Sequence, residues 1–586
     1  MNGLLLCAAL LFQDPGVAGD GPGGFPGLAA GRAPRVEIPW NRLYDVPELY
    51  AHFDRLAAAY PELLTGRVIG RSVEDREMRV YTLHNPATGP DTAKPAMWID
   101  GNVHGNEVQG GEAALYAAWY LLENHGSNER VTELVDGSTF YLMPSVNPDG
   151  RANWFQRAHS ASSSRSGVRP VDNDRDGELD EDGPDDLDGD GNIVQMRKYV
   201  PGEGTHRLNA DDPRILERVP PVAPDGTARK GDWLLFFSEG IDNDGDGRVN
   251  EDGPGGYDMN RAWPSSWMPE HVQYGAGAYP LYWPEARCIA EFLLEHPNVA
   301  AVQSFHNAGG MILRGPGTAT YGSYPSADVR VYDELGRDGE RMLPFYRYMI
   351  IWSDLYTVFG GFVNWTYEGL GILSFSNELW TSRRNSPDER LGRSQDDRLF
   401  FDDSLLMGAG FVDWKPYDHP LYGEIEIGGF AKDVGRVPPT FLIEEMLHRN
   451  ALFCLRHAEA MPRVSIGEPR FSSLADGVIA VDVVFANERA IPTRTALAAE
   501  KHVGRPDRFT LEGEGIEVLA GGFRSDRWHP ERIELAEREP ARLLRERGLG
   551  SREELRVRWF VRGAGELRIG WSGEKAVDVV RTARLE

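Results

Sequence analysis

His104 and Glu107 are the two residues of this sequence whose types and spacing point most directly to chemistry. They follow a short apolar run, 96–99, and a Gly-rich turn, and a helix-like stretch, 108–122, comes after them. Because a strand that ends at such a turn holds its last side chains at a fixed edge, the imidazole and the carboxylate can reach one metal ion. Zinc accepts both ligand types, and a catalytic zinc keeps one position open for water. The alternative for so short a motif is a pair of polar residues on a surface turn.

A second group of candidate ligands lies in an acidic repeat. Residues 172–184 and 242–254 are identical at nine of thirteen positions, and a shorter copy occupies 186–193. Carboxylates at alternate positions before a Gly let a tight loop direct several oxygens at one hard cation, and calcium takes roughly six to eight oxygen ligands. The Glu of position 12 in an EF-hand loop is absent, so we expect structural calcium in loops of another kind, with a solvated acidic loop as the alternative. The candidate calcium ligands are Asp172, Asp174, Asp176, Asp186, Asp188, Asp190, Asp242, Asp244 and Asp246.

The composition limits the class of protein. With 586 residues the chain is too long for one hydrophobic core, so two or more domains are expected. A net charge of −28 argues against a nucleic-acid partner, because phosphate binding needs a basic face. Cys288 and Cys454 lie in helix-like apolar runs and are too few for a disulfide framework, so they are expected to be buried free thiols.

The N-terminal segment predicts export. Residues 3–12 form an apolar run that is too short to span a bilayer but fits the core of a secretory signal peptide. Small residues near 17–19 offer a cleavage site, so we expect a signal peptide over 1–19 and a Gly/Pro-rich linker over 20–35. The mature protein is therefore expected to be secreted or to lie in the cell envelope, and a misassigned start codon is the alternative.

Strand-like and helix-like runs alternate over residues 36–461. Short apolar strands are expected at 66–69, 78–83, 96–99, 139–143 and 299–305, with helices at 46–63, 108–122, 284–294 and 439–460. This order predicts an α/β fold with a mixed, mostly parallel central sheet and helices on both faces. Sites in such sheets lie beyond the carboxyl ends of the strands, which is where His104 and His306 fall.

The pattern changes after Pro462. Short strands separated by turns are expected at 478–485, 516–519, 554–561 and 566–571. Residues 462–586 therefore predict a C-terminal all-β, sandwich-like domain, with a β extension of the first domain as the alternative. Residues 170–256, which carry the acidic repeats, are expected to be an insertion within the 36–461 domain.

Five segments in a fixed order carry a resemblance to a known family. They are His104-Gly105-Asn106-Glu107, Asn147-Pro148-Asp149-Gly150, Asp258-Met259-Asn260-Arg261, Ser304-Phe305-His306 and Phe375-Ser376-Asn377-Glu378-Leu379. This order resembles the zinc carboxypeptidase family, the carboxypeptidase A-like metallopeptidases. The resemblance covers roughly residues 40 to 460.

The resemblance implies a role for each matching residue in a catalytic zinc site. His104, Glu107 and His306 would be the zinc ligands and would leave a fourth position for water. Glu378 would be the general base. Asp258 matches the residue that receives the second imidazole N–H of the first His ligand and so orients its ring.

The resemblance also implies a substrate pocket. Asn260 and Arg261 match the pair that holds the terminal carboxylate of the substrate, and Tyr356 would cap that carboxylate. Val363 falls at the pocket floor, and an apolar floor disfavours a Lys or Arg side chain. We therefore expect neutral or apolar C-terminal residues in the substrate.

The family also has an Arg that stabilises the oxyanion, and here the resemblance is incomplete. Arg197, in Gln195-Met196-Arg197-Lys198, resembles the W-R-K of the family and is the first candidate. Arg157 is the second candidate. Asn106 stands where carboxypeptidase A has an Arg, which puts one subsite in doubt.

Together these residues predict a secreted zinc metallocarboxypeptidase that removes the C-terminal residue of peptides or proteins. A related zinc amidohydrolase that acts on cell-wall peptides is one alternative, and a non-catalytic binding protein on a peptidase scaffold is another. No nucleic-acid partner and no transmembrane segment are expected. The sequence leaves open the oligomeric state and the role of the C-terminal domain.

Overall fold

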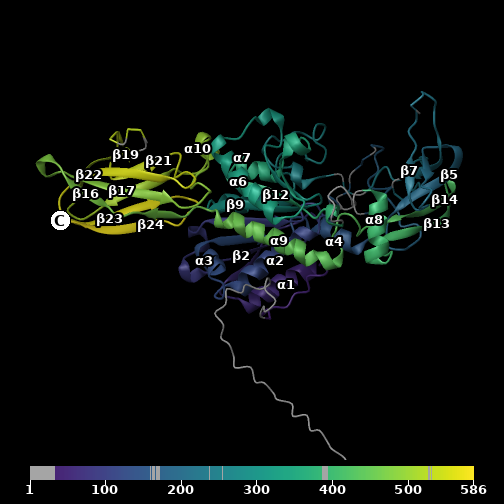
Figure 1. Cartoon of the computed structure of the whole chain (residues 1–586), viewed down its shortest axis with the longest axis horizontal. Coiled ribbons are helices and arrows are strands. Elements are labelled where there is room, and N and C mark those ends of the chain that lie inside the picture. The colour runs from purple at the N-terminus through teal and green to yellow at the C-terminus, as the bar shows by residue number, and fades with distance from the viewer. Residues whose placement is uncertain are drawn as a thin grey trace, which may run out of the picture.

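The computed structural model describes residues 33–586, except for 159, 161–164, 167–169, 171, 174, 223, 237, 254, 256, 386–393, 525–527 and 530. The predicted signal peptide, 1–19, and most of the predicted linker, 20–35, lie outside the described residues and stay predictions. Within the described ranges, we find no helix that combines the length and the hydropathy that a membrane span requires. Figure 1 shows an elongated molecule with an α/β body in the middle, a β domain at one end and a second, smaller sheet at the other end.

The α/β body is built on an eight-stranded mixed sheet in the order β1-β2-β4-β3-β9-β12-β10-β11. The central strands β4, β3, β9 and β12 are parallel to one another, which confirms the predicted fold class. Alternate side chains of β3 pack on opposite faces: Met97 and Ile99 enter one core, and Trp98 enters the other. The bounds are β1 Leu64–Arg71, β2 Glu77–Leu83, β3 Ala96–Gly101, β4 Thr139–Met143, β9 Val299–Asn307, β10 Met311–Arg314, β11 Arg347–Ile350 and β12 Leu373–Leu379.

Helices cover both faces of this sheet. Residues of α1, α2, α6 and α9 share one buried core with one face, and residues of α5 and α7 share the other core. α1 starts at a capping box, in which Asp45 accepts the backbone N–H of Glu48. The bounds are α1 Val46–Ala59, α2 Gln109–Asn124, α3 Glu129–Gly137, α4 Pro148–Gln156, α5 Pro284–Glu295, α6 Ser326–Met342, α7 Phe362–Glu368, α8 Gln395–Phe401 and α9 Thr440–Glu459. Cys288 on α5 and Cys454 on α9 are buried free thiols, as predicted.

A second, six-stranded sheet has the order β13-β14-β5-β8-β6-β7. Four of its strands come from the acidic insertion, but β13 and β14 come from residues 411–430. β14 pairs with β5, so the insertion shares its sheet with a segment that lies far along the chain. The bounds are β5 Gln195–Gly204, β6 His206–Leu208, β7 Leu216–Arg218, β8 Gly231–Phe236, β13 Phe411–His419 and β14 Gly423–Phe430.

The described residues of the C-terminal part are mostly β, with one short helix, α10 Ala496–Glu500, and a 3-10 turn at Ala475–Gly477. One sheet has the order β15-β17-β22-β19-β20, with β16 beside β17, and the other has the order β21-β18-β23-β24. Inward-facing residues of both sheets form one core, as in a sandwich. The bounds are β15 Val464–Ile466, β16 Arg470–Ser473, β17 Ile479–Asn487, β18 Asp507–Glu512, β19 Glu517–Arg524, β20 Glu534–Leu535, β21 Arg542–Arg545, β22 Glu554–Arg562, β23 Gly565–Ser572 and β24 Val579–Leu585.

Candidate active site

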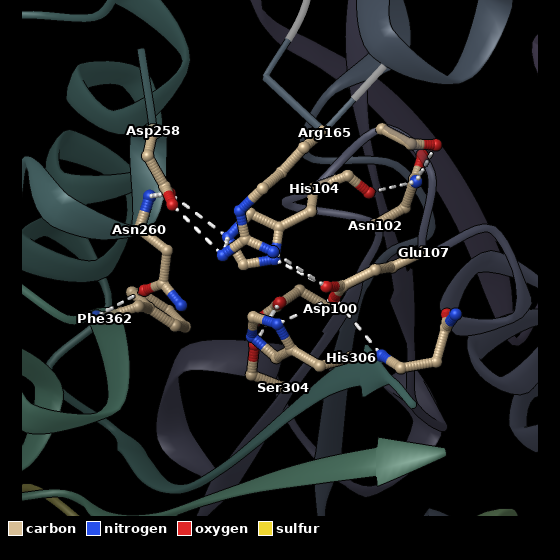
Figure 2. Close-up of polar contacts among 12 residues, drawn as sticks. Asp100, Asn102, His104, Glu107, Arg165, Asp258, Asn260, Ser304, His306 and Phe362 are labelled. Atoms are coloured by element: carbon tan, nitrogen blue, oxygen red, sulfur yellow. Dashed lines mark hydrogen bonds and ion pairs between the residues drawn. The ribbon is translucent and has the colours of Figure 1, made fainter. Parts of the chain in front are cut away.

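The three predicted zinc ligands meet where neighbouring parallel strands end. His104 and Glu107 lie in the turn after β3, and His306 lies near the end of β9, the strand beside β3. Glu107 Oε1 is 2.9 Å from His104 Nδ1, and Glu107 Oε2 is 3.0 Å from His306 Nδ1 (Figure 2). The structure therefore gathers two imidazole nitrogens and one carboxylate from distant parts of the chain.

The turn that carries His104 and Glu107 is held by close backbone packing. A Cβ on Gly101 would lie 2.3 Å from the backbone of Gly110, so only glycine lets the end of β3 approach the start of α2. Asn102 has a φ of +62° and donates its side-chain amide to the backbone carbonyls of His104 and Gly105, at 2.8 and 3.1 Å. The local sequence thus fixes the direction of both ligands.

Asp258 lies behind the His104 ring. Its Oδ1 is 3.1 Å from His104 Nε2 and also accepts the backbone N–H of Asn260 at 2.8 Å. Burial alone would raise the pKa of Asp258, but His104, Arg261 and Arg165 outweigh burial and hold the pKa well below its usual range. An ionised Asp258 orients the ring so that Nδ1 faces Glu107.

This donor set fits a zinc ion. His104, Glu107 and His306 are all buried, and one ligand atom from each lies within 4.8 Å of the others. His104 Nδ1 is enclosed and lies 2.9 Å from Glu107 Oε1, but it forms no well-aligned hydrogen bond with the described residues, and a metal ion held by both atoms would satisfy it. Two nitrogens and one carboxylate are also a ligand set of hydrolytic zinc sites.

Glu378 lies beside these residues. It is on β12, directly across from His306 of the parallel strand β9. Burial, and after it the neighbouring negative charge of Glu107, raises the pKa of Glu378 to about 7. A carboxyl group with such a pKa can both accept and release a proton near neutral pH.

The predicted substrate residues line the same cavity, which has a volume of about 260 Å³. Asn260, Arg261 and Val363 lie in its wall, and Tyr356, 51% exposed, lies at its rim. Figure 2 shows Asp258 and Asn260 on one side of His104, with Glu107 and His306 on the other side. Of the described residues in 172–253, none lines this cavity.

Arg197 does not lie in the cavity, so its prediction as the oxyanion-stabilising residue is wrong in position. Its guanidinium lies between the rings of Trp233 and Trp414 and donates to Glu426 at 2.6 Å. Arg197 is on β5, which pairs with β14, so its side chain packs within the second sheet. Arg157, the second candidate, is exposed after α4 and does not line the cavity either.

Two other arginines, Arg165 and Arg436, line the cavity instead. Arg165 Nη1 is 3.2 Å from Glu107, and its Nη2 is 3.1 Å from Asp258. The backbone carbonyl of Arg165 accepts the N–H of Gly105 at 2.8 Å, which ties this arginine to the ligand turn. Arg165 follows the Asn147-Pro148-Asp149-Gly150 motif at a short distance along the chain, and this could have marked it as a candidate site residue. Nothing in the sequence pointed to Arg436.

The acidic repeats also come together. An isolated bridge pairs Asp182 with Asp252, the same position in the two copies. Each carboxylate accepts backbone N–H groups from the other copy: Asp182 from Asn243 and Asn250, and Asp252 from Asn173 and Asp180. The repeats therefore form one paired unit.

Carboxylates gather in four groups within this unit and beside it. The groups are Asp176, Glu181 and Asp244; Asp182, Asp244 and Glu251; Asp186, Asp188 and Glu239; and Asp242, Asp244 and Asp246. Asp172 and Asp190 are in none of these groups, and Asp174 lies outside the described residues. Both carboxylate oxygens of Glu251 and one of Glu181 are enclosed without a hydrogen-bond partner among the described residues. Glu181, Glu239 and Glu251 are candidate ligands in addition to the predicted aspartates.

Segments of this chain are similar to known carboxypeptidases. A segment of 104 residues is 38% identical to carboxypeptidase D of Homo sapiens, and a segment of 146 residues is 31% identical to carboxypeptidase A2 of Rattus norvegicus. These segments span 18% and 24% of this chain, but only 8% and 34% of the two relatives. The solved structure of carboxypeptidase A from Helicoverpa armigera aligns with a TM-score of 0.42 and 16% identity over 74% of this chain and 77% of that one.

Two families match by their sequence profiles. Residues 463–584 match a family described only as a domain of unknown function. Residues 49–178 and 218–398, more than half of the chain, match the family described as zinc carboxypeptidase. The match includes the segments that carry His104, Glu107, Asp258, His306 and Glu378. The chain is therefore a member of the zinc carboxypeptidase family.

Proposed function

We propose that this protein is a zinc metallocarboxypeptidase that hydrolyses the C-terminal peptide bond of peptides. The observation that carries the proposal is a single cavity with three kinds of group along its wall. These are the metal-binding set of His104, Glu107 and His306, the carboxyl of Glu378, and the guanidinium of Arg261. A cleft that combines a metal set, a base of raised pKa and a buried cation fits hydrolysis at a free carboxylate terminus.

Zinc, when bound, would supply a Lewis acid that lowers the pKa of water and polarises the scissile carbonyl. Glu378 would take the proton from the attacking water and later deliver it to the leaving amine. Arg165, which lines the cavity, would direct its N–H groups at the carbonyl oxygen as negative charge develops there. Water adds across the peptide bond, so the products are a free amino acid and a peptide one residue shorter.

Arg261 and Asn260 would select the end of the chain. Arg261 is 8% exposed, and its Nη1 donates to the backbone carbonyl of Asn260 at 2.9 Å, which directs the guanidinium along the cavity wall. A planar guanidinium pairs with a carboxylate through two parallel hydrogen bonds. Tyr356 at the rim would close over the bound carboxylate.

The wall around the substrate side chain is apolar, which supports a preference for neutral C-terminal residues. Met311, Leu313, Ile351, Val358 and Val363 line it. Among the described lining residues, only Glu107 and Glu378 carry a carboxylate, and both belong to the metal and base positions. A Lys or Arg side chain would therefore be buried without a partner, at a cost of several kcal/mol by order of magnitude.

This preference can be tested with blocked dipeptides that differ only in the C-terminal residue. We expect Phe and Leu to be released with the highest kcat/KM and Lys and Arg about 100-fold more slowly, and Val363→Asp to shift the preference toward Lys and Arg. A wild-type preference for Lys would contradict the assignment of this wall. Purified cell-wall peptides in the same assay test the zinc amidohydrolase alternative, and zinc binding without any hydrolysis would favour the binding-protein alternative.

We also propose that the paired acidic repeats bind calcium. Asp242, Asp244 and Asp246 form one carboxylate group, and Glu251 adds two enclosed oxygens beside Asp244. Burial, and after it the hydrogen bond and negative charge of Asp182, raise the pKa of Glu251 to about 7. A hard divalent cation bound by these oxygens would offset the repulsion between the carboxylates.

The calcium proposal predicts a cation-dependent rise in stability. With calcium at about 100 times its Kd, the Tm of the zinc-loaded wild type should rise by several degrees, because binding to the folded state adds about 2.7 kcal/mol. Asp244→Asn should abolish the rise, since Asp244 belongs to three of the carboxylate groups. Asp225→Asn, an exposed carboxylate of the same insertion outside these groups, is the matched control and should keep it. An unchanged Tm of the wild type in calcium would contradict the proposal.

A further inference from the structure

Arg436 is a second cation in the wall of the cavity, and no sequence motif contains it. It lies in the connection between β14 and α9, far along the chain from both histidines. Its side chain is 29% exposed and lines the cavity. Because this connection is distant in sequence from the other site residues, contacts of its backbone must fix the position of the arginine.

The backbone of Arg436 is tied to both metal-ligand segments. Its carbonyl accepts the side-chain amide of Gln109 at 2.8 Å and that of Asn307 at 3.3 Å. Gln109 comes two residues after Glu107, and Asn307 directly follows His306; both are buried. These two contacts make the position of Arg436 depend on the fold of the site itself.

The guanidinium of Arg436 is only partly used within the protein. Its Nη2 donates to the backbone carbonyl of Asn307 at 2.7 Å and lies 3.4 Å from Glu107 Oε1. Its Nε is enclosed without a hydrogen-bond partner among the described residues. The enclosed Nε cannot reach a ligand, but Nη1 donates to none of the described residues, so its two N–H groups remain for a ligand in the cavity.

The two arginines reach Glu107 from different sides. Arg165 comes from the side of Asp258, whereas Arg436 comes from the side of Asn307. In Figure 2 Asp258 and Asn260 lie to one side of His104, and Glu107 and His306 lie to the other side. A peptide whose terminal carboxylate is bound at Asn260 and Arg261 would extend past the metal ligands, and its acyl half would approach Arg436.

We propose that Arg436 binds the acyl half of the substrate by donating to the main-chain carbonyl oxygen one residue before the scissile carbonyl. This inference rests on the proposed carboxypeptidase function and adds a specificity residue to it. Asn106, between the ligands His104 and Glu107, does not supply a hydrogen-bond donor to this carbonyl, since it is 2% exposed and does not line the cavity. Arg436 would make the enzyme favour substrates that continue as a peptide beyond the bond that is cut.

A matched pair of substrates isolates this hydrogen bond. Benzoyl-Gly-Phe has the upstream carbonyl, and 4-phenylbutanoyl-Phe has the same chain length but lacks that carbonyl and the N–H beside it. Since a guanidinium only donates hydrogen bonds, a loss caused by Arg436→Gln reports on the carbonyl and not on the N–H. We expect Arg436→Gln to lose about 10- to 100-fold in kcat/KM on the first substrate, as for a hydrogen bond to a charged group, and less than about threefold on the second. Arg436→Lys should retain part of the difference. Lys432→Gln, which removes a cation of the same connection that does not line the cavity, should behave as wild type on both.

Zinc content is measured on each variant, because Arg436 also touches Glu107. An equal loss on both substrates would mean that Arg436 only holds the ligand turn, and it would overturn the proposal; no loss on either would do the same.

Dissociation constants of both peptides for zinc-loaded Glu378→Gln, with and without Arg436→Gln, give a readout that needs no turnover. If the wild type hydrolyses neither peptide, the carboxypeptidase function fails. A selective loss of binding of benzoyl-Gly-Phe would then still support the role of Arg436, and a uniform loss or no binding would overturn it.

Discussion

Replacement of Glu378 by Gln is expected to lower kcat by about 10²- to 10⁴-fold, the usual contribution of a general base, and to leave zinc bound. The amide keeps the size of the side chain but cannot accept the proton of the attacking water. Glu378 lies across from His306 on the neighbouring strand, and none of the three atoms of the metal set belongs to it. Steady-state kinetics and metal analysis on the same preparations provide the test.

The control for this variant is Glu444→Gln. Glu444 is an exposed carboxylate on α9 and does not line the cavity. We expect wild-type kcat for the control. If Glu378→Gln retained more than about a tenth of the wild-type kcat, another group would have to be the base. Loss of zinc together with activity would instead assign Glu378 to the metal set.

The pH profile of kcat/KM tests the ionisation of Glu378. Burial and the charge of Glu107 raise the pKa of Glu378 to about 7, and a bound cation draws that pKa downward. Because only the ionised form accepts a proton, kcat/KM should rise with increasing pH through an acid limb at or below pH 7. The residual activity of Glu378→Gln should lack this limb, and an identical limb in both proteins would point to a different ionising group.

The positions that sequence could predict are those set by local pattern. β3 and β9 are continuous buried runs that end at polar turns, so the places of His104 and His306 follow from burial and chain direction. Glu378 was expected only from its family motif, and the structure places it on β12 across from His306. The family match confirms the predicted family, and the mixed sheet confirms the predicted fold class.

The errors arose where contacts join distant segments. Arg197 resembles its family motif in letters, but pairing of β5 with β14 carries it into the second sheet. Arg436 reaches the cavity only because the β14–α9 connection packs against Gln109 and Asn307. The pairing of Asp182 with Asp252 likewise joins residues seventy positions apart. The repeat marks Asp182 and Asp252 as equivalent positions but does not show that they pair, and the contacts of Arg197 and Arg436 have no periodicity or spacing signal, because tertiary packing determines them.

Replacement of Arg261 by Gln is expected to remove the selection for a free carboxylate terminus. The wild type should hydrolyse a peptide acid about 100-fold or more faster, in kcat/KM, than the same peptide with a C-terminal amide, since truncating one partner of a buried charge pair costs roughly 2–5 kcal/mol. Arg261→Gln should lower kcat/KM for the peptide acid by about this factor and leave the low kcat/KM for the peptide amide unchanged. Arg261→Lys should keep part of it as a point charge without the bidentate geometry.

The amide substrate makes the result specific to the carboxylate. Arg261 Nη1 is 3.9 Å from Asp258 Oδ2, so a disturbance of Arg261 could also reach His104 through Asp258. Such a disturbance would slow the acid and the amide equally and would lower the zinc content, because Asp258 orients the ring of His104. A loss confined to the acid, with full zinc content, therefore assigns Arg261 to the terminal carboxylate. An equal loss on both substrates would remove the structural reason for calling the enzyme an exopeptidase and would favour cleavage at another amide.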